Sequence, residues 1–203
     1  MKKSRWLLIG GSTLLVAASV FFLGLRAFET SRAFRGSAIG TPYPPAADFE
    51  LQRTNGSLYR LSEHRGKVVL IYAGFTNCPD FCPGTLAKFK QIADSLGDDA
   101  KHVDFVFVTV DPDRDTPAVI TAYLNNFSPD FIGLTGSMDQ LLAFWTDYGA
   151  GRIPEQPDAD GNYEVSHSTR VWVIDKGGLL RITFPFEMTA SDMTHDLRLL
   201  LAE

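Results

Sequence analysis

Two cysteines, Cys78 and Cys82, are the only ones in the chain of 203 residues, and three residues separate them. Thiolates bind soft metal ions and take part in disulfide exchange, so the pair is suited to either chemistry. If the segment is helical, side chains four residues apart lie on one face, and the free amides at a helix N-terminus stabilise a thiolate. A structural disulfide is the alternative, but closing so short a loop gains little stability. The spacing therefore favours metal binding or a redox switch.

A metal ion would need a third donor, and the chain has four histidines. We expect His64, His102 and His195 to be surface residues, because they fall beside a turn, after a polar loop and on a terminal helix. His167 follows the polar segment Arg152–Asn162 at the start of a predicted strand, which would hold its ring while the loop leaves it accessible. Taken alone, an ordinary strand histidine is the simpler interpretation of His167.

The elements that would position these residues alternate between strand and helix, which predicts an α/β domain with a parallel central sheet. Continuous apolar runs predict buried strands, and apolar residues at steps of three and four predict helices. Pro83 follows Cys82 and is expected to bend its helix or delay its start. The predicted strands are Val68–Phe75, Val103–Val110 and Ile132–Thr135, and the predicted helices are Leu86–Leu96, Pro117–Phe127, Met138–Tyr148 and Thr189–Leu200.

Turn and cap residues supply further expectations. Asn55-Gly56 between apolar runs is a strong hairpin signal. A second hairpin is predicted from Val165–Ile174 and Leu179–Phe184. Ser137 and Gln140 have the spacing of a capping box for the helix that follows them.

Charge is distributed unevenly along the chain. The formal net charge is −5, yet residues 1–36 hold six basic side chains and one acidic one, so residues 37–203 carry −10. An acidic body argues against nucleic-acid binding, which needs a concentrated basic face. The twenty residues from Trp6 to Leu25 contain no charge, and as a helix they would span about 30 Å, the thickness of a bilayer's hydrocarbon core.

The basic residues before this apolar run predict its orientation. With Lys2, Lys3 and Arg5 on the cytoplasmic side, the body lies outside the cytoplasm, in the periplasm, on a single-pass anchor in the inner membrane. A cleaved signal peptide is the alternative, although the run is longer than usual for one. We therefore divide the chain into a basic start and transmembrane helix at 1–25, a tether at 26–45 and one domain at 46–203.

Three separated segments resemble, in order along the chain, the Sco/SenC family of thioredoxin-like copper proteins. The resemblance implies a thioredoxin-like α/β fold, with a central mixed sheet flanked by helices and an extra N-terminal hairpin. It also implies a membrane-anchored assembly factor for the binuclear copper centre of cytochrome c oxidase, with Cys78, Cys82 and His167 as ligands of one copper ion. The matching segments are Gly74–Pro83, Val110–Pro117, and Val165–Ser168 with Val173–Asp175.

The donor set agrees with copper, because two thiolates and one imidazole suit trigonal Cu(I) and can hold Cu(II) when a further ligand arrives. Structural zinc would want a fourth protein ligand. The sequence departs from the family at Asn77, where the family often has His, and at Ser166, where it often has Asp. The absent carboxylate removes an expected contribution to Cu(II) affinity or to the orientation of the histidine.

Two functions fit these residues. The first is a metallochaperone, not an enzyme, that delivers copper to the copper-centre subunit of the oxidase by exchange of ligands. The second is a thiol-disulfide oxidoreductase, in which Cys78 and Cys82 are the redox-active pair and reduce the oxidase subunit before it receives metal. Another copper chaperone or a thioredoxin-like reductant is a further expected partner.

The segment Asp111, Asp113 and Asp115 alternates like the start of a calcium loop. The required glycine and glutamate are replaced by Thr116 and Ala122, so calcium is excluded. The family resemblance implies that this segment lies near the copper site, and two interpretations stay open: it shapes the docking surface or the electrostatics of the site, or it is a solvated turn between a strand and a helix. We expect Met138, Met188 and Met193 to pack in the core or on the surface rather than to bind copper through their thioethers, since they form no cluster.

Overall fold

The computed structural model describes residues 33–158 and 163–203, and the compact unit that they form begins at Phe34 and ends at Glu203. The predicted membrane span Trp6–Leu25 lies outside the described residues. Within the described part of the chain, no helix has the length and apolar character needed to cross a membrane.

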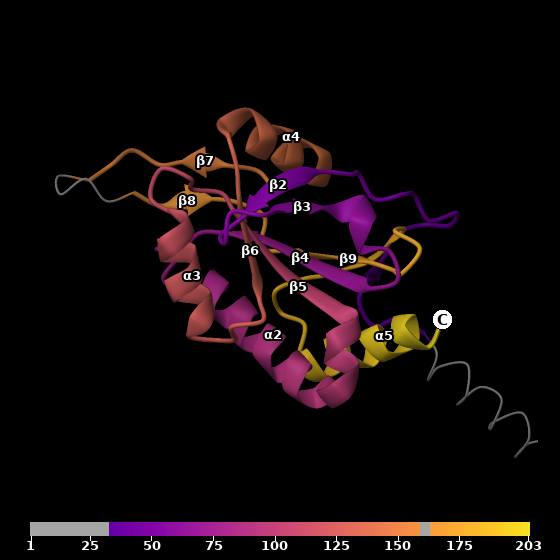
Figure 1. Cartoon of the computed structure of the whole chain (residues 1–203). Helices are drawn as coiled ribbons and strands as arrows, with labels where there is room; N and C mark the ends of the chain where they lie inside the picture. The colour runs from indigo at the N-terminus through magenta and orange to yellow at the C-terminus, as the bar shows by residue number, and fades with distance from the viewer. Residues whose placement is uncertain (1–32, 159–162) are drawn as a thin grey trace, which may run out of the picture. The chain divides into compact units, whose positions relative to one another are not determined.

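The unit is built on an eight-stranded mixed sheet with the order β1-β10-β9-β4-β5-β6-β2-β3 (Figure 1). The neighbours β4, β5 and β6 are parallel, and every other pair of neighbours is antiparallel. The strands are β1 (Ser37–Ala38), β2 (Glu50–Arg53), β3 (Leu58–Arg60), β4 (Val68–Gly74), β5 (Val103–Thr109), β6 (Ile132–Thr135), β9 (Val171–Ile174) and β10 (Leu180–Phe184). A separate two-stranded sheet pairs β7 (Ile153–Pro154) with β8 (Val165–Ser166).

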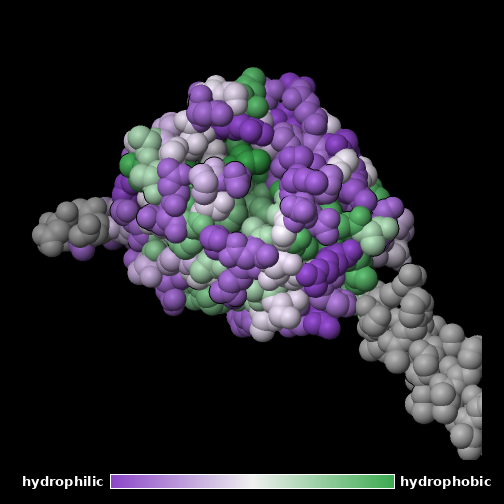
Figure 2. All heavy atoms as spheres, turned by 60° about the horizontal axis from the view of Figure 1, so that its bottom comes forward, coloured by the Kyte–Doolittle hydropathy of each residue, from purple (hydrophilic) through white to green (hydrophobic). Residues whose placement is uncertain are grey.

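Helices cover both faces of the sheet. Figure 1 shows α2 (Phe81–Leu96), α3 (Pro117–Asn125) and α5 (Ala190–Ala202) on one face and α4 (Met138–Tyr148) on the other. Short 3-10 helices, η1 (Leu61–His64) and η2 (Gly97–His102), precede β4 and β5. Figure 2 views the side of α2, α3 and α5, where most side chains are hydrophilic and the hydrophobic ones are scattered. The helices thus turn their apolar sides toward the sheet, as their periodicity predicts.

The two central strands are the most buried part of the fold. Every residue of β4 and β5 is buried, as expected for strands covered on both faces. They pair in parallel from Val68 opposite Val103 to Gly74 opposite Thr109. Both strands therefore end at the same edge of the sheet, and the chain leaves that edge toward the two cysteines.

Most predicted elements are confirmed. The first hairpin forms with Gly56 at φ 87°, a left-handed conformation that glycine adopts without strain. Ser137 and Gln140 make the complete capping box of α4, and Gly149 ends that helix in the left-handed conformation. The Thr189 side chain caps α5. The centre of the sheet, β4, β5 and β6, is parallel as predicted, and the whole sheet is mixed, as the family resemblance implied, because its other pairs of neighbours are antiparallel.

The second predicted hairpin is the main difference within the domain. The segment Val165–Ile174 is not one strand: β8 ends at Ser166 and pairs with β7, while β9 begins at Val171 and pairs with β4 and β10. An apolar pattern reports burial but not the strand partner, so it could not show that the pairing changes between these residues.

The start of the domain also differs from the sequence-based division. Residues 37–45, which fall in the predicted tether, lie along β10 and the turn before it: β1 pairs with β10, and the amides of Ile39 and of Ala46, the first residue after the tether, donate to the carbonyls of Arg181 and Gly178. The prolines and glycines here gave a linker-like composition, which does not exclude pairing at the edge of a sheet.

Candidate metal centre

Cys78 lies in the loop between β4 and α2, and not on the helix. Its backbone amide donates to the carbonyl of Phe75 (3.4 Å), and its side chain is at the edge of burial, with 9% of the residue exposed. The sequence placed the two cysteines on one helical face only if the whole segment were helical, and this condition is not met because α2 begins at Phe81. The sulfur of Cys78 instead faces the first turn of the helix.

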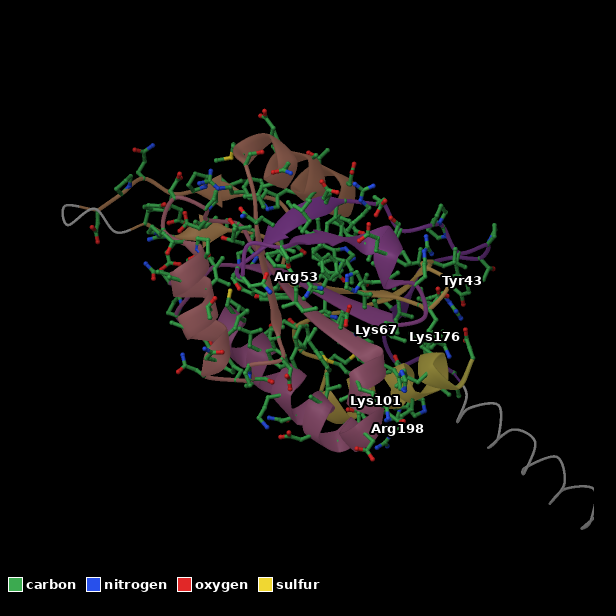
Figure 3. The ribbon with its side chains drawn as sticks, in the orientation of Figure 1. Tyr43, Arg53, Lys67, Lys101, Lys176 and Arg198 are labelled. Carbon is green, nitrogen blue, oxygen red and sulfur yellow. The ribbon has the colours of Figure 1, made fainter. Side chains whose placement is uncertain are left out.

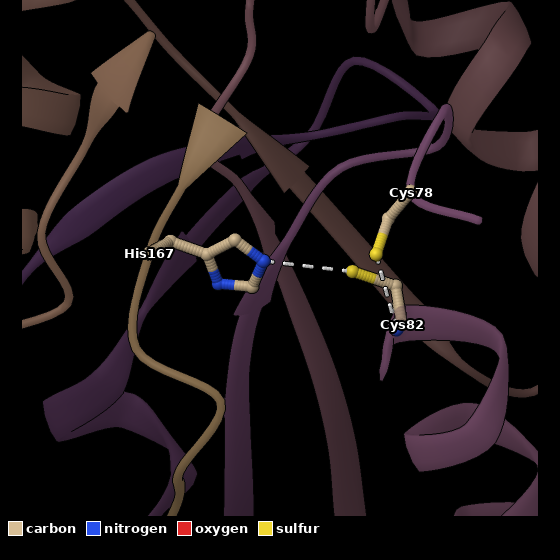
Figure 4. Close-up of side chains that lie close together, drawn as sticks. All are labelled: Cys78, Cys82 and His167. Carbon is tan, nitrogen blue, oxygen red and sulfur yellow. Dashed lines mark hydrogen bonds between the residues drawn. The ribbon is translucent and has the colours of Figure 1, made fainter. Parts of the chain in front are cut away.

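Cys82 is the second residue of α2 and is fully buried. Its amide, one of those that have no partner within the helix, points at the sulfur of Cys78 at 3.4 Å (Figure 4). Its own sulfur accepts a hydrogen bond from the hydroxyl of Tyr72 on β4 (3.3 Å). Pro83, expected to bend or delay the helix, lies in its first turn, where the missing amide proton costs nothing.

His167 lies directly after β8, in the link to β9 and not in a strand. Its Nδ1 is 2.8 Å from the carbonyl oxygen of Ser168, an arrangement in which Nδ1 carries the proton and donates. Nε2 then has a free lone pair, and it lies 3.7 Å from the sulfur of Cys82 (Figure 4). The rings of Tyr72 and Phe75 contact the imidazole edge-on, with centroids 6.1 and 5.7 Å away, and so restrict its orientation.

The structure therefore brings together the three side chains singled out in the sequence. The two sulfurs and one imidazole nitrogen all lie within 4.8 Å of one another. Metal–ligand bonds of about 2.0–2.3 Å place two ligands of one ion at most about 4.6 Å apart, so the group needs little movement to share an ion. Two soft sulfurs and one imidazole fit copper, and the vacant lone pair of His167 Nε2 is the form that binds metal.

The two cysteines differ in protonation. The pKa of Cys78 is lowered to about 4, first because the Cys82 thiol donates a hydrogen bond to it, and further by the backbone amide of Cys82. Burial raises the pKa of Cys82, and the neighbouring Cys78 raises it further. At neutral pH the metal-free pair thus consists of one thiolate at the edge of burial and one fully buried thiol.

The other histidines lie outside this group. His102 is exposed, as predicted. The side chain of His64 is only 17% exposed, and its Nδ1 is 2.5 Å from Asp104. Lys67, which is labelled in Figure 3, contacts the same carboxylate. The side chain of His195 is 21% exposed and its Nδ1 lies 2.9 Å from Asp196. The prediction of a surface position is therefore wrong for His64 and His195, because buried carboxylates hold both rings.

Some features of the site escaped the sequence analysis. Tyr72 was read only as part of a buried strand, although its hydroxyl contacts Cys82. Gly74 leaves room for the metal centre, since an added Cβ would lie 3.0 Å from the sulfur of Cys82. Among the methionines, Met188 and Met193 are buried in the core and Met138 is 45% exposed, which agrees with the expectation of core or surface packing.

Comparison with known proteins identifies the family to which the chain belongs. The SCO1/SenC family model matches residues 40–202. The chain belongs to the SCO1/SenC family. It is 37% identical to a SCO2-like protein of Rickettsia felis over 80% of each chain.

Solved structures of the family share the fold. ScoI of Bradyrhizobium japonicum with copper bound is 32% identical, with a TM-score of 0.71 over 77% of this chain and 99% of that one. Copper-bound ScoI of Arabidopsis thaliana is 27% identical, with a TM-score of 0.71 over 78% of this chain and 99% of that one. The thioredoxin-like α/β fold with a mixed sheet is thereby confirmed, and two relatives of this SCO1/SenC chain bind copper.

Proposed function

We propose that this SCO1/SenC protein binds one copper ion through Cys78, Cys82 and His167 and delivers it to the copper-centre subunit of cytochrome c oxidase. The observation that carries the proposal is the convergence of two sulfurs and a free imidazole nitrogen within 4.8 Å, from segments 85 residues apart in the sequence. Copper-bound relatives with the same fold support the identity of the metal.

Release proceeds by exchange of ligands. The side chain of Cys82 is fully buried, whereas Cys78 is at the edge of burial and His167 is partly exposed. A thiolate of the recipient therefore approaches from the side of Cys78 and His167 and replaces these two ligands first. The buried Cys82 stays bound to the ion during this step. Copper stays bound to protein ligands throughout, and the acidic body offers a surface for a basic partner.

The apolar run Trp6–Leu25 bears on where delivery takes place. In this proposal it anchors the protein in the inner membrane, with the domain on the periplasmic side where the oxidase subunit exposes its copper centre. The anchor would then keep donor and recipient at the same membrane surface, which raises their effective concentration.

The experiment is an anaerobic titration of the reduced full chain with Cu(I) and with Cu(II). We expect one tightly bound equivalent, and a loss of Cu(II) affinity of about tenfold or more in His167→Ala, since removing even a residue that only orients a metal ligand lowers metal affinity by that factor. His102→Ala is the matched control, because that ring is exposed and is not part of the group. An unchanged Cu(II) affinity in His167→Ala would exclude His167 as a ligand.

A second function, thiol-disulfide exchange with the oxidase subunit, is favoured by one observation. A thiolate of low pKa at the edge of burial, beside a fully buried thiol, is the arrangement of an attacking and a resolving cysteine. This function requires Cys78 and Cys82 to cycle between dithiol and disulfide without metal, and it makes His167 dispensable. Turnover of a disulfide substrate by metal-free His167→Ala at the wild-type rate would favour it over copper delivery.

A further inference from the structure

The turn of residues 111–115, which follows β5, contacts both halves of the metal centre. It contains two buried aspartates, and its backbone is closed by hydrogen bonds from the amides of Arg114 and Asp115 to the carbonyl of Asp111 (3.2 and 2.9 Å). Asp111 is 0% exposed and Asp115 is 1% exposed, whereas the side chain of Asp113 is 67% exposed. Buried carboxylates are costly unless they are paired, so their partners show what they hold.

Asp111 holds the segment that carries His167. Its Oδ1 accepts a hydrogen bond from the hydroxyl of Tyr163 (2.7 Å), two residues before β8, and its Oδ2 accepts one from Arg114 Nε (2.5 Å). The guanidinium of Arg114 stacks on the ring of Tyr163, with its carbon 3.6 Å from the centroid. The guanidinium carbon also lies 5.8 Å from the centroid of the Phe75 ring, which meets His167 edge-on.

Asp115 holds the loop that carries Cys78. One oxygen accepts from the amide (3.1 Å) and the hydroxyl (2.6 Å) of Thr76, two residues before Cys78. The other oxygen accepts from the hydroxyl of Thr109 at the end of β5 (2.6 Å). The cysteine loop is therefore fastened to the same turn as the histidine segment.

We propose that the turn 111–115 positions the two outer ligands, with Asp111 acting on His167 through Tyr163 and Asp115 acting on Cys78 through Thr76. This inference deepens the proposed function and rests on the role of His167 as a ligand. One rigid turn then sets the separation between the thiolate and the imidazole, and neither aspartate contacts the metal. Of the two interpretations left open by the sequence, it selects the one that includes the turn in the site.

The contacts of Asp111 and Asp115 are expected to affect the binding of Cu(I) and Cu(II) differently. Cu(I) prefers thiolates, so it depends on both cysteines and less on the imidazole, whereas Cu(II) also requires the nitrogen donor. Loss of the hydrogen bond between Tyr163 and Asp111 should therefore lower the affinity for Cu(II) selectively. Loss of the hydrogen bond between Thr76 and Asp115 should lower the affinity for both ions, because Cys78 is a ligand of each.

The test uses two substitutions that each remove one hydroxyl from the reduced full chain. Tyr163→Phe removes the donor to Asp111, and Thr76→Val removes a donor to Asp115 while keeping the shape of the side chain. Tyr123→Phe is the matched control, because the Tyr123 hydroxyl is buried near the site and has no hydrogen-bond partner among the described residues. Affinities for Cu(I) and Cu(II) are measured by competition with chelators, and nitrogen coordination of Cu(II) is followed by electron paramagnetic resonance.

We expect Tyr163→Phe to lower Cu(II) affinity about tenfold and to weaken the nitrogen signature, with Cu(I) affinity close to wild type. Thr76→Val should lower both affinities by a similar factor. A merely structural role would lower both affinities together in Tyr163→Phe. That result, or identity of Tyr163→Phe with Tyr123→Phe in all three measurements, would overturn the inference.

His167→Ala in the same series separates this inference from the proposed function. Loss of the nitrogen signature in His167→Ala but not in Tyr163→Phe would overturn the positioning role alone. An unchanged signature in His167→Ala would overturn both, because His167 would then not be a ligand.

Discussion

The amide of Cys82 and the sulfur of Cys78 lie 3.4 Å apart, and through this contact the first turn of α2 acts on the cysteine outside the helix. A free amide and the positive end of the helix dipole both favour negative charge on that sulfur. Cys82 is itself inside the first turn but fully buried, so it retains its proton. Two cysteines of one short motif thus have opposite protonation states at neutral pH.

Alkylation of the reduced, metal-free chain tests this difference. Because the pKa of Cys78 is lowered to about 4, the thiolate is present above that pH and is lost only as the pH falls through it. We expect the rate of reaction with iodoacetamide to be nearly constant from pH 8 down to about pH 5, with modification at Cys78 and not at Cys82. The measurement is the rate of mass increase, with the modified residue located by peptide mapping.

Cys82→Ala provides the control for that experiment. It removes the thiol that is the main cause of the low pKa of Cys78, so the midpoint of the alkylation profile should move to higher pH. A midpoint near the ordinary value of about 8.5 in the wild-type chain would contradict the assignment of a thiolate to Cys78.

Close packing around Gly74 leads to a second prediction. A Cβ at this position would lie 2.8 Å from the Tyr72 ring, 2.9 Å from Phe107 and 3.0 Å from the Cys82 sulfur. Gly74→Ala should therefore lower the free energy of unfolding by about 1–3 kcal/mol and weaken copper binding by displacing the sulfur. Urea unfolding and the copper titration measure the two effects. Gly40→Ala is the control, because nothing lies within 4 Å of its added Cβ, and equal behaviour of the two variants would refute the prediction.

Local patterns were enough to predict most of the fold. Uninterrupted apolar runs located β4 and β5, and the capping box of Ser137 with Gln140 located the start of α4, because each signal depends on residues close in the sequence. The pairing of β8 with β7 depends on contacts with another segment, and no local pattern reports it.

The candidate site, like the fold, was predicted where its signals are local in the sequence and not where they depend on contacts between distant segments. The two cysteines could be found from their spacing alone, whereas His167 was selected through the resemblance to a family. The contacts of Tyr72 with Cys82 and of Tyr163 with Asp111 join residues 10 and 52 positions apart. Such contacts arise from the folded sheet, so the sequence left the role of the aspartate turn open.

The start of the domain gives the last prediction. Asp196 on α5 is 0% exposed, and its carboxylate accepts hydrogen bonds from the amides of Arg35 (2.9 and 3.0 Å) and Gly36 (2.8 Å). Tyr43 lies against the Arg181 guanidinium, 4.2 Å from the ring centroid (Figure 3). A chain that begins at residue 46 loses these contacts and leaves a buried carboxylate without its amide donors.

We therefore expect a chain beginning at residue 46 to be less stable than one beginning at residue 33 by about 2–4 kcal/mol, since a hydrogen bond to a charged group contributes about 1.5–3 kcal/mol. Urea unfolding of both chains measures the difference. Asp196→Asn provides the decisive comparison: it should destabilise the longer chain by removing a charged acceptor, and it should have a clearly smaller effect in the shorter one, which has lost the amide donors of Arg35 and Gly36 and keeps the contact of Asp196 with His195. Equal effects of Asp196→Asn in the two chains would show that the segment 33–45 does not stabilise the domain through Asp196.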